Sequence, residues 1–260
     1  MRKKILTLIL VTVFVLSISA CSSKTENTDL DYIKEKGKLV VGITDFEPMD
    51  YKDSDGKWIG FDADLANAFA KELGVEAEFM EIEWGNKIFE LDGKTVDCIW
   101  NGMTLTNEVT SSMNCTKAYL NNAQVVVMKN SEAGKYPDVQ SLKNLSFAVE
   151  EGSSGAQAAS DNGLKTTNVD SQAAALMEVA AGTSDAAIID SLMAAAMIGK
   201  GTSYEDLTYT ISLNSEEYGV GFRKGSNVTE KLNAYFDKIK KDGTLESLAE
   251  KYKVQAALIK

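Results

Sequence analysis

Residues 91–99 (LDGKTVDCI) and residues 179–188 (VAAGTSDAAI) carry the same local pattern in the two halves of the chain. In each stretch the end of an apolar helix is followed by a glycine, a short polar turn, an aspartate and an apolar run that suits a buried strand. Helices that alternate with buried strands are typical of a parallel sheet covered by helices. The repeat therefore predicts an α/β fold with two similar lobes.

Strand and helix patterns alternate on both sides of these stretches. The expected order in the first half is a strand at 39–41, a hairpin turn at 52–57, a helix at 61–73, a strand at 75–82, a short helix at 86–91 and a strand at 96–100. The second half repeats this order, with strands at 145–149, 166–169 and 185–189 and helices after 155, at 173–181 and at 192–198. Two amphipathic helices, at 228–239 and 245–252, close the chain.

Cys21 ends a segment with the features of an export signal. Residues 1–4 (MRKK) are basic, and residues 5–16 are apolar residues and threonines over a length that is short for a membrane span. Residues 18–21 (ISAC) resemble the lipobox of bacterial lipoproteins, in which the cysteine is lipidated and begins the mature protein. We therefore expect a signal peptide at 1–20, a lipid anchor on Cys21, a flexible tether at 21–31 and a location on the extracytoplasmic face of the cell membrane. An ordinary signal peptide, or a membrane anchor with an incidental cysteine, is the alternative.

The charge of the chain narrows its partners. The net charge is −11, and without the three basic residues of the leader there are 24 basic against 38 acidic residues, or −14. An acidic protein is a poor partner for nucleic acid and is not attracted to anionic lipid. A small ligand is still possible, because a binding site can differ in sign from the surface average.

The composition also bears on catalysis and on cysteine chemistry. The chain contains no histidine, which excludes a Ser-His-Asp triad, a Cys-His pair and a histidine-ligated metal site. No strong nucleophile–base motif remains, so we expect no enzyme activity, no cofactor and no metal. Beyond Cys21, an exported protein could bridge Cys98 and Cys115, but Cys98 lies in an apolar run and a buried free thiol is the other prediction.

Several segments resemble one family when they are taken together. These are residues 38–42 (KLVVG), 55–66 (DGKWIGFDADLA), 101–106 (NGMTLT), 185–190 (DAAIID), 218–225 (YGVGFRKG) and 242–245 (DGTL). In this order they are similar to motifs of the family 3 extracellular solute-binding proteins, the amino-acid receptors of ABC importers. No single motif is specific, but the series covers nearly all of the mature chain.

The resemblance implies a fold and a function. The fold would be the two-lobed periplasmic-binding-protein fold of type II, with lobe 1 at 32–121 plus 219–260, lobe 2 at 122–218, and two hinge strands beside a ligand cleft. The protein would be a monomeric receptor that closes on a polar amino acid or a related small solute and delivers it to an ABC permease in the membrane. The alternatives are a surface ligand sensor on the same fold and a dehydratase-type enzyme on the same scaffold.

The resemblance also implies a set of ligand contacts. An aromatic clamp, a polar loop after a strand, the start of a helix and a strand-end carboxylate would supply them: Phe46 and Trp84; Asn101, Gly102, Met103 and Thr104; Ser153 and Ser154; and Asp190. The loop and the serines would bind the ligand's carboxylate and ammonium, and the aspartate would pair with its α-ammonium. The structural alternatives are core aromatics, a tight turn, a serine N-cap and an aspartate that caps the following helix.

One position departs from the family pattern. The family usually places an arginine that grips the α-carboxylate where this chain has Val109. The only arginines are Arg2 in the leader and Arg223, which we expect to be exposed. Lys87 or Lys117 could substitute as a point charge, backbone donors could suffice, or the ligand could lack an α-carboxylate in that place.

Overall fold

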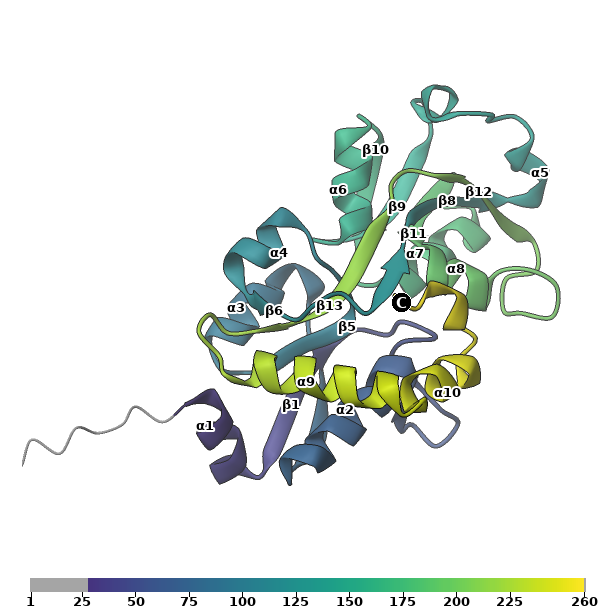
Figure 1. Cartoon of the computed structure of the whole chain (residues 1–260). Coiled ribbons are helices and arrows are strands. Elements are labelled where there is room, and N and C mark those ends of the chain that lie inside the picture. Colours follow the sequence, from purple (N-terminus) through teal and green to yellow (C-terminus); the bar gives the residue numbers. More distant parts are fainter. Residues whose placement is uncertain (1–27, 260) are drawn as a thin grey trace, which may run out of the picture.

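The computed structural model describes residues 28–259, which form two α/β lobes, each built around one sheet (Figure 1). The six-stranded sheet of the first lobe has the order β4-β1-β5-β13-β6, with β7 paired to β13, and the five-stranded sheet of the second has the order β10-β9-β11-β8-β12. The strands of the first sheet are β1 (Lys38–Ile43), β4 (Glu76–Glu81), β5 (Cys98–Thr104), β6 (Asn114–Cys115), β7 (Leu120–Asn122) and β13 (Glu216–Phe222). Those of the second are β8 (Gln124–Lys129), β9 (Ser146–Glu150), β10 (Lys165–Val169), β11 (Ala186–Asp190) and β12 (Leu207–Ser212).

Helices flank both sheets, and a small hairpin of β2 (Tyr51–Lys52) and β3 (Trp58–Ile59) lies beside the first. The first lobe carries α1 (Asp29–Lys36), α2 (Phe61–Leu73), α3 (Lys87–Asp92), α4 (Asn107–Ser112), α9 (Val228–Lys241) and α10 (Thr244–Lys251). The second carries α5 (Asn130–Ala133), α6 (Ser154–Asp161), α7 (Gln172–Ala181) and α8 (Ser191–Met197). Among these described helices, none has both the length and the apolar character that crossing a bilayer requires.

The repeated sequence pattern becomes the centre of each lobe. α3, its turn and β5 form one copy, and α7, its turn and β11 form the other. β5 lies parallel to β1, and β11 lies parallel to β9, so both copies join parallel strands that are buried by helices. Gly182 ends α7 in the left-handed conformation with φ 80°, whereas Lys94 takes the left-handed place after α3 with φ 61°. The two α/β units that the sequence predicts are therefore present.

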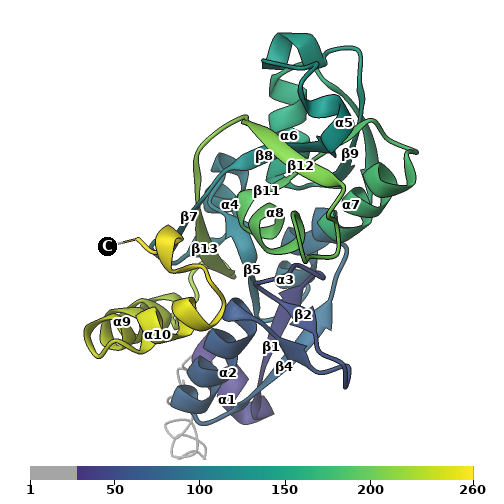
Figure 2. The ribbon, with the colours of Figure 1, turned by 90° about the vertical axis from the view of Figure 1, so that its right-hand side faces the viewer.

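Two crossings connect the lobes, as the side view shows (Figure 2). The chain passes from β7 to β8 and returns from β12 to β13. At the crossings β7 and β13 pair antiparallel, with Asn122 opposite Glu216. The hinge is thus a short two-stranded ladder, and a small change at its ends can rotate one lobe against the other.

Two local expectations were wrong. Residues 101–104 are the end of β5 and not a loop, because β5 continues past an irregularity in its pairing with β13, where Gly102 has φ +54°. The tether predicted to reach residue 31 ends earlier, because Thr28 caps α1, which starts at Asp29. Within the described residues, Cys98 and Cys115 are both free thiols, so the prediction of a buried free thiol at Cys98 is confirmed and the two cysteines form no disulfide. Cys21 and the signal peptide lie outside the described residues.

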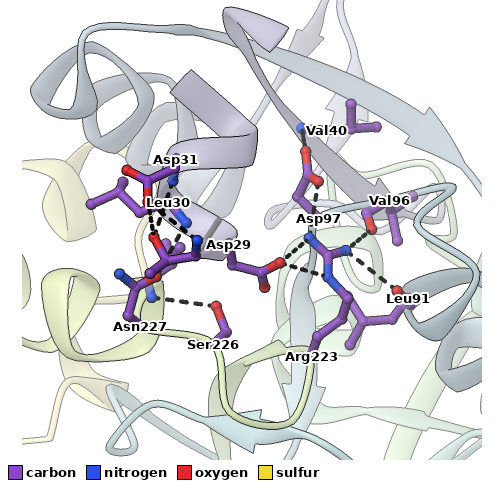
Figure 3. Close-up of polar contacts among 12 residues, drawn as sticks. Asp29, Leu30, Asp31, Val40, Leu91, Val96, Asp97, Arg223, Ser226 and Asn227 are labelled. Atoms are coloured by element: carbon purple, nitrogen blue, oxygen red, sulfur yellow. Dashed lines mark hydrogen bonds and ion pairs between the residues drawn. The ribbon is translucent and has the colours of Figure 1, made fainter. Parts of the chain in front are cut away.

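Arg223 is buried, which contradicts the prediction that it is exposed (Figure 3). Its guanidinium lies 2.9 Å from Asp29 and 3.3 Å from Asp97, and Nη1 donates to the carbonyl oxygens of Val96 and Leu91. The carboxylate of Asp97 also accepts from the Val40 backbone at 2.8 Å. The arginine therefore ties α1 to the turn before β5, a long-range contact that no local pattern reveals.

Candidate functional site

A cavity of about 510 Å³ lies between the lobes, at the carboxyl ends of the sheet strands. It is lined by every residue predicted to contact a ligand: Phe46, Trp84, Asn101, Gly102, Met103, Thr104, Ser153, Ser154 and Asp190. The fold therefore gathers these residues from both lobes around one space of a size that suits a small solute. Their contact with a ligand remains a prediction.

The aromatic wall serves the core and the cavity together. Phe46 is 2% exposed and packs edge-on against Tyr218, with ring centroids 6.4 Å apart. Gly102 makes room for it, because a Cβ at that position would lie 2.5 Å from the Phe46 ring. Trp84 is 8% exposed and belongs to a separate apolar cluster. Phe46 and Trp84 thus belong to apolar clusters, as the core alternative holds, and they also line the cavity, as the clamp prediction requires.

Several hydrogen-bonding groups of residues 101–104 already have partners within the protein. The Asn101 side chain donates to the Thr44 carbonyl at 3.1 Å and to Asp50 at 2.8 Å, and it accepts from the Thr44 backbone and hydroxyl. The N–H of Gly102 donates to Asp62 at 2.7 Å. Asn101 and the Gly102 N–H are consequently scaffold groups, although the prediction treated this segment as a set of free ligand donors.

Ser154 and Thr104 both hydrogen-bond Glu216, a residue that the sequence analysis did not predict as part of the site. Ser153 Oγ accepts from the Ala156 backbone at 3.1 Å and so caps α6. Ser154 and Thr104 donate their hydroxyls to the two oxygens of Glu216, the latter at 2.9 Å. Glu216 also accepts from Asn122 and Gln124, both at 2.7 Å. A hinge carboxylate therefore bonds both lobes, and two adjacent glutamates at a strand start offered no signal of this in the sequence.

Asp190 is 4% exposed and is surrounded by side-chain donors that carry no charge. Its carboxylate accepts from Asn122, Gln124 at 2.9 Å, Tyr218 at 2.8 Å and Gln172. Burial, and then the nearby charge of Glu216, raise the pKa of Asp190 well above its usual range. Asp190 makes no side-chain cap to α8, so the capping alternative is wrong.

Lys87 and Glu150 are two buried charged residues of the cavity lining. Lys87 Nζ donates to the carbonyl oxygens of Trp84 at 3.2 Å and Gly152 at 2.9 Å, and burial lowers its pKa. Glu150 is 2% exposed, and burial raises its pKa to about 8. The other lysine considered, Lys117, is exposed and lies 3.8 Å from Asp237, so it does not line the cavity.

Val109 occupies the cavity wall where an arginine was expected, and it is 2% exposed. The charged groups of the wall are then Lys87 and the carboxyls of Glu108, Glu150, Asp161 and Asp190. Such a lining favours cations over anions. Within residues 28–259, no group of three or more cysteine, aspartate or glutamate side chains could hold a metal ion.

Comparisons with known proteins show the family of the chain and agree with its fold. The family model of the bacterial extracellular solute-binding proteins, family 3, matches residues 39–255. The arginine-binding extracellular protein ArtP of Bacillus subtilis is 30% identical over 262 residues, which cover 96% of this chain and 98% of ArtP. The L-cystine-binding protein TcyJ of Escherichia coli is 28% identical over 228 residues, or 86% of this chain and 85% of TcyJ. The structure of an ABC uptake transporter substrate-binding protein from Streptococcus pneumoniae with bound histidine superposes with a TM-score of 0.82 at 25% identity, covering 91% of this chain and all of that one.

Proposed function

The chain belongs to the bacterial extracellular solute-binding proteins of family 3, and on this premise we propose that it is the amino-acid receptor of an ABC importer. The relatives described above are named as binding proteins for arginine and cystine. The chain has no histidine to act as a general base, and we propose that it binds its ligand without transforming it.

The observation that carries the proposal is the environment of Asp190. A buried carboxylate is costly unless a positive charge compensates it, and its four side-chain donors are all neutral. Asp190 faces the cavity, so the α-ammonium of an amino acid can supply the missing charge. Lys87, the hydroxyls and the backbone near α6 are the candidate partners of the α-carboxylate.

Closure at the hinge is the change by which a bound ligand would be signalled to the permease. Glu216 bonds Thr104 of the first lobe and Ser154 of the second, and Lys87 bonds Gly152 across the same cleft. These contacts exist only when the lobes are close, so a ligand that touches both lobes stabilises the closed form by its differential affinity. A permease can then distinguish the loaded receptor from the empty one.

We also propose that the receptor is a monomer held at the membrane by a lipid on Cys21. The export signal and the lipobox-like residues 18–21 support this. Globomycin, which blocks lipoprotein signal peptidase, should leave the signal peptide attached, and the variant Cys21→Ala should abolish incorporation of labelled palmitate. Continued labelling of Cys21→Ala would refute the anchor without affecting the proposed ligand.

Thermal-shift screening of the purified domain against the twenty amino acids tests the binding proposal. An amino acid at 100 times its dissociation constant should add about 2.7 kcal/mol to stability. The variant Asp190→Asn should lose this shift, while Asp185→Asn, in the exposed turn just before the same strand, should keep it. The amino-acid assignment fails if no amino acid raises the melting temperature of the unmodified domain.

A further inference from the structure

We propose that Glu150 recognises a second positive charge on the ligand, so that the receptor selects solutes with a cationic group at each end. The inference rests on the proposed function, because it assigns the ligand's α-ammonium to Asp190. It adds a specificity-determining residue that neither the sequence motifs nor the names of the relatives indicate.

Glu150 has the position of a ligand-binding group. It ends β9, the parallel neighbour of β11, which Asp190 ends, so the two carboxyls lie at the same edge of the second sheet. Both line the cavity. Gln172 lies near both of them, because it donates to Asp190 and it lowers the pKa of Glu150.

Glu150 differs from the scaffold groups of the cavity in having an unused oxygen. Its Oε1 is buried and has no hydrogen-bond partner among residues 28–259. Asn101, in contrast, bonds through both of its terminal side-chain atoms. Buried polar atoms in folded proteins are almost always paired, so an unpaired carboxyl oxygen on a cavity wall indicates a partner that enters the cavity.

A negative charge on Glu150 has no full compensation among the protein groups around it. Lys87 is a nearby cation, but its Nζ is engaged by the carbonyls of Trp84 and Gly152 and lies 5.1 Å from the centre of the Trp84 ring. Burial is the largest influence on the pKa of Glu150, and Thr44, Lys87 and Gln172 offset it only in part. A ligand ammonium or guanidinium would bond the free oxygen and supply the charge together.

The aromatic walls fit the same kind of ligand. Phe46 and Trp84 line the cavity that contains both carboxyls. Aromatic faces accept aliphatic stems and attract cations. A chain with a positive group at either end therefore matches two carboxyls and the apolar surfaces beside them. Cationic amino acids and their decarboxylated amines share this chemistry.

Isothermal titration calorimetry with matched ligands tests the inference. L-Arginine and L-citrulline have nearly the same shape and differ in the charge at the far end, and agmatine is arginine without its carboxylate. We expect the unmodified protein to bind arginine at least tenfold more tightly than citrulline. Glu150→Gln should weaken arginine about 10- to 100-fold and leave citrulline unchanged or tighter, because only the charged partner is lost. The control Glu151→Gln changes the neighbouring exposed carboxyl and should match the unmodified protein.

Each other outcome has a defined meaning. Equal binding of arginine and citrulline, or an equal loss of both in Glu150→Gln, overturns the inference and leaves the proposed function intact. Binding of agmatine without arginine supports the second charge but refutes the amino-acid receptor. Agmatine that binds more weakly than arginine supports both and identifies the amino acid as the source of the charge. If none of the three ligands binds while another amino acid does, the inference alone is wrong.

Discussion

Closure of the lobes can be blocked at Gly152, which lines the cavity but has no side chain to contact a ligand. A Cβ at this position would lie 2.6 Å from the Cα of Gly85 in the other lobe and 3.2 Å from its nitrogen. Carbon atoms in contact normally lie about 3.5–4.0 Å apart, and backbone cannot rotate away as a side chain can. The variant Gly152→Ala should therefore force the lobes apart by about 1 Å at this point.

The expected size of the loss in ligand affinity follows from the hydrogen bond that this separation breaks. The hydrogen bond from Lys87 Nζ to the Gly152 carbonyl is 2.9 Å long, and an extra ångström takes it beyond bonding range. A hydrogen bond to a charged group contributes about 1.5–3 kcal/mol, so the closed form should lose about 2 kcal/mol. Because apparent affinity scales with the fraction of competent protein, the dissociation constant should rise about 30-fold.

Backbone strain needs its own control. Gly152 has φ +69°, where alanine costs about 1–2 kcal/mol, but this cost applies to open and closed forms alike. Gly163 has φ +63° and no atom within 4 Å of the place that a Cβ would take, so Gly163→Ala carries the strain without the collision. Urea unfolding should show a similar loss of stability in both variants. Calorimetry with the tightest ligand of the thermal-shift screen should show weaker binding only in Gly152→Ala. Equal affinity of the two variants would refute closure at this contact.

Three further outcomes test other parts of the structure. Arg223→Met should lower the free energy of unfolding measured with urea by about 3 kcal/mol, because it leaves the fully buried Asp97 with fewer partners. Ligand affinity should be unchanged. A loss of stability below about 1 kcal/mol would contradict this expectation. The pKa of Glu150 rises from 4.5 in the unfolded state to about 8 in the folded state, so the folded state keeps the proton to higher pH. The stability of the ligand-free protein should therefore fall as the pH rises between these two values. Glu150→Gln should reduce that fall, and identical pH profiles would exclude a buried, ionisable Glu150. Val109→Arg should raise the affinity for arginine about tenfold but not for agmatine, because the new guanidinium meets only an α-carboxylate, and an equal gain for both would place the carboxylate elsewhere.

The α/β architecture could be predicted from local patterns because each element carries its own signal. The stripe of α2 ends at Gly74, which adopts the left-handed conformation at φ 80° as a helix-ending glycine does. The strand β1 is buried along five of its six residues and reads as an apolar run. The end of β5 was mistaken for a loop because its polar residues and Gly102 look like a turn, while the pairing partner β13 lies more than 100 residues away.

The candidate site could be predicted only in part. Family motifs placed Phe46, Trp84 and Asp190 on the cavity, since these positions lie at the carboxyl ends of strands in two sheets that both border the cavity. Glu216 was missed because its role depends on Thr104 and Ser154, which come from different lobes. Arg223 was misjudged for the same reason, because its partners Asp29 and Asp97 are distant in the chain.

The sequence by itself determined the two α/β units and the residues that could face a cleft, and it predicts an export signal with Cys21, because periodicity, glycine positions and short motifs are local properties. Only the tertiary structure decided which polar groups are already satisfied and which are not. Asn101 and the Gly102 N–H turned out to be engaged, while Glu150 retained a free oxygen on the cavity wall. Burial and hydrogen bonding are set by atoms that come together only on folding, and these atoms decide what charge the cleft can accept.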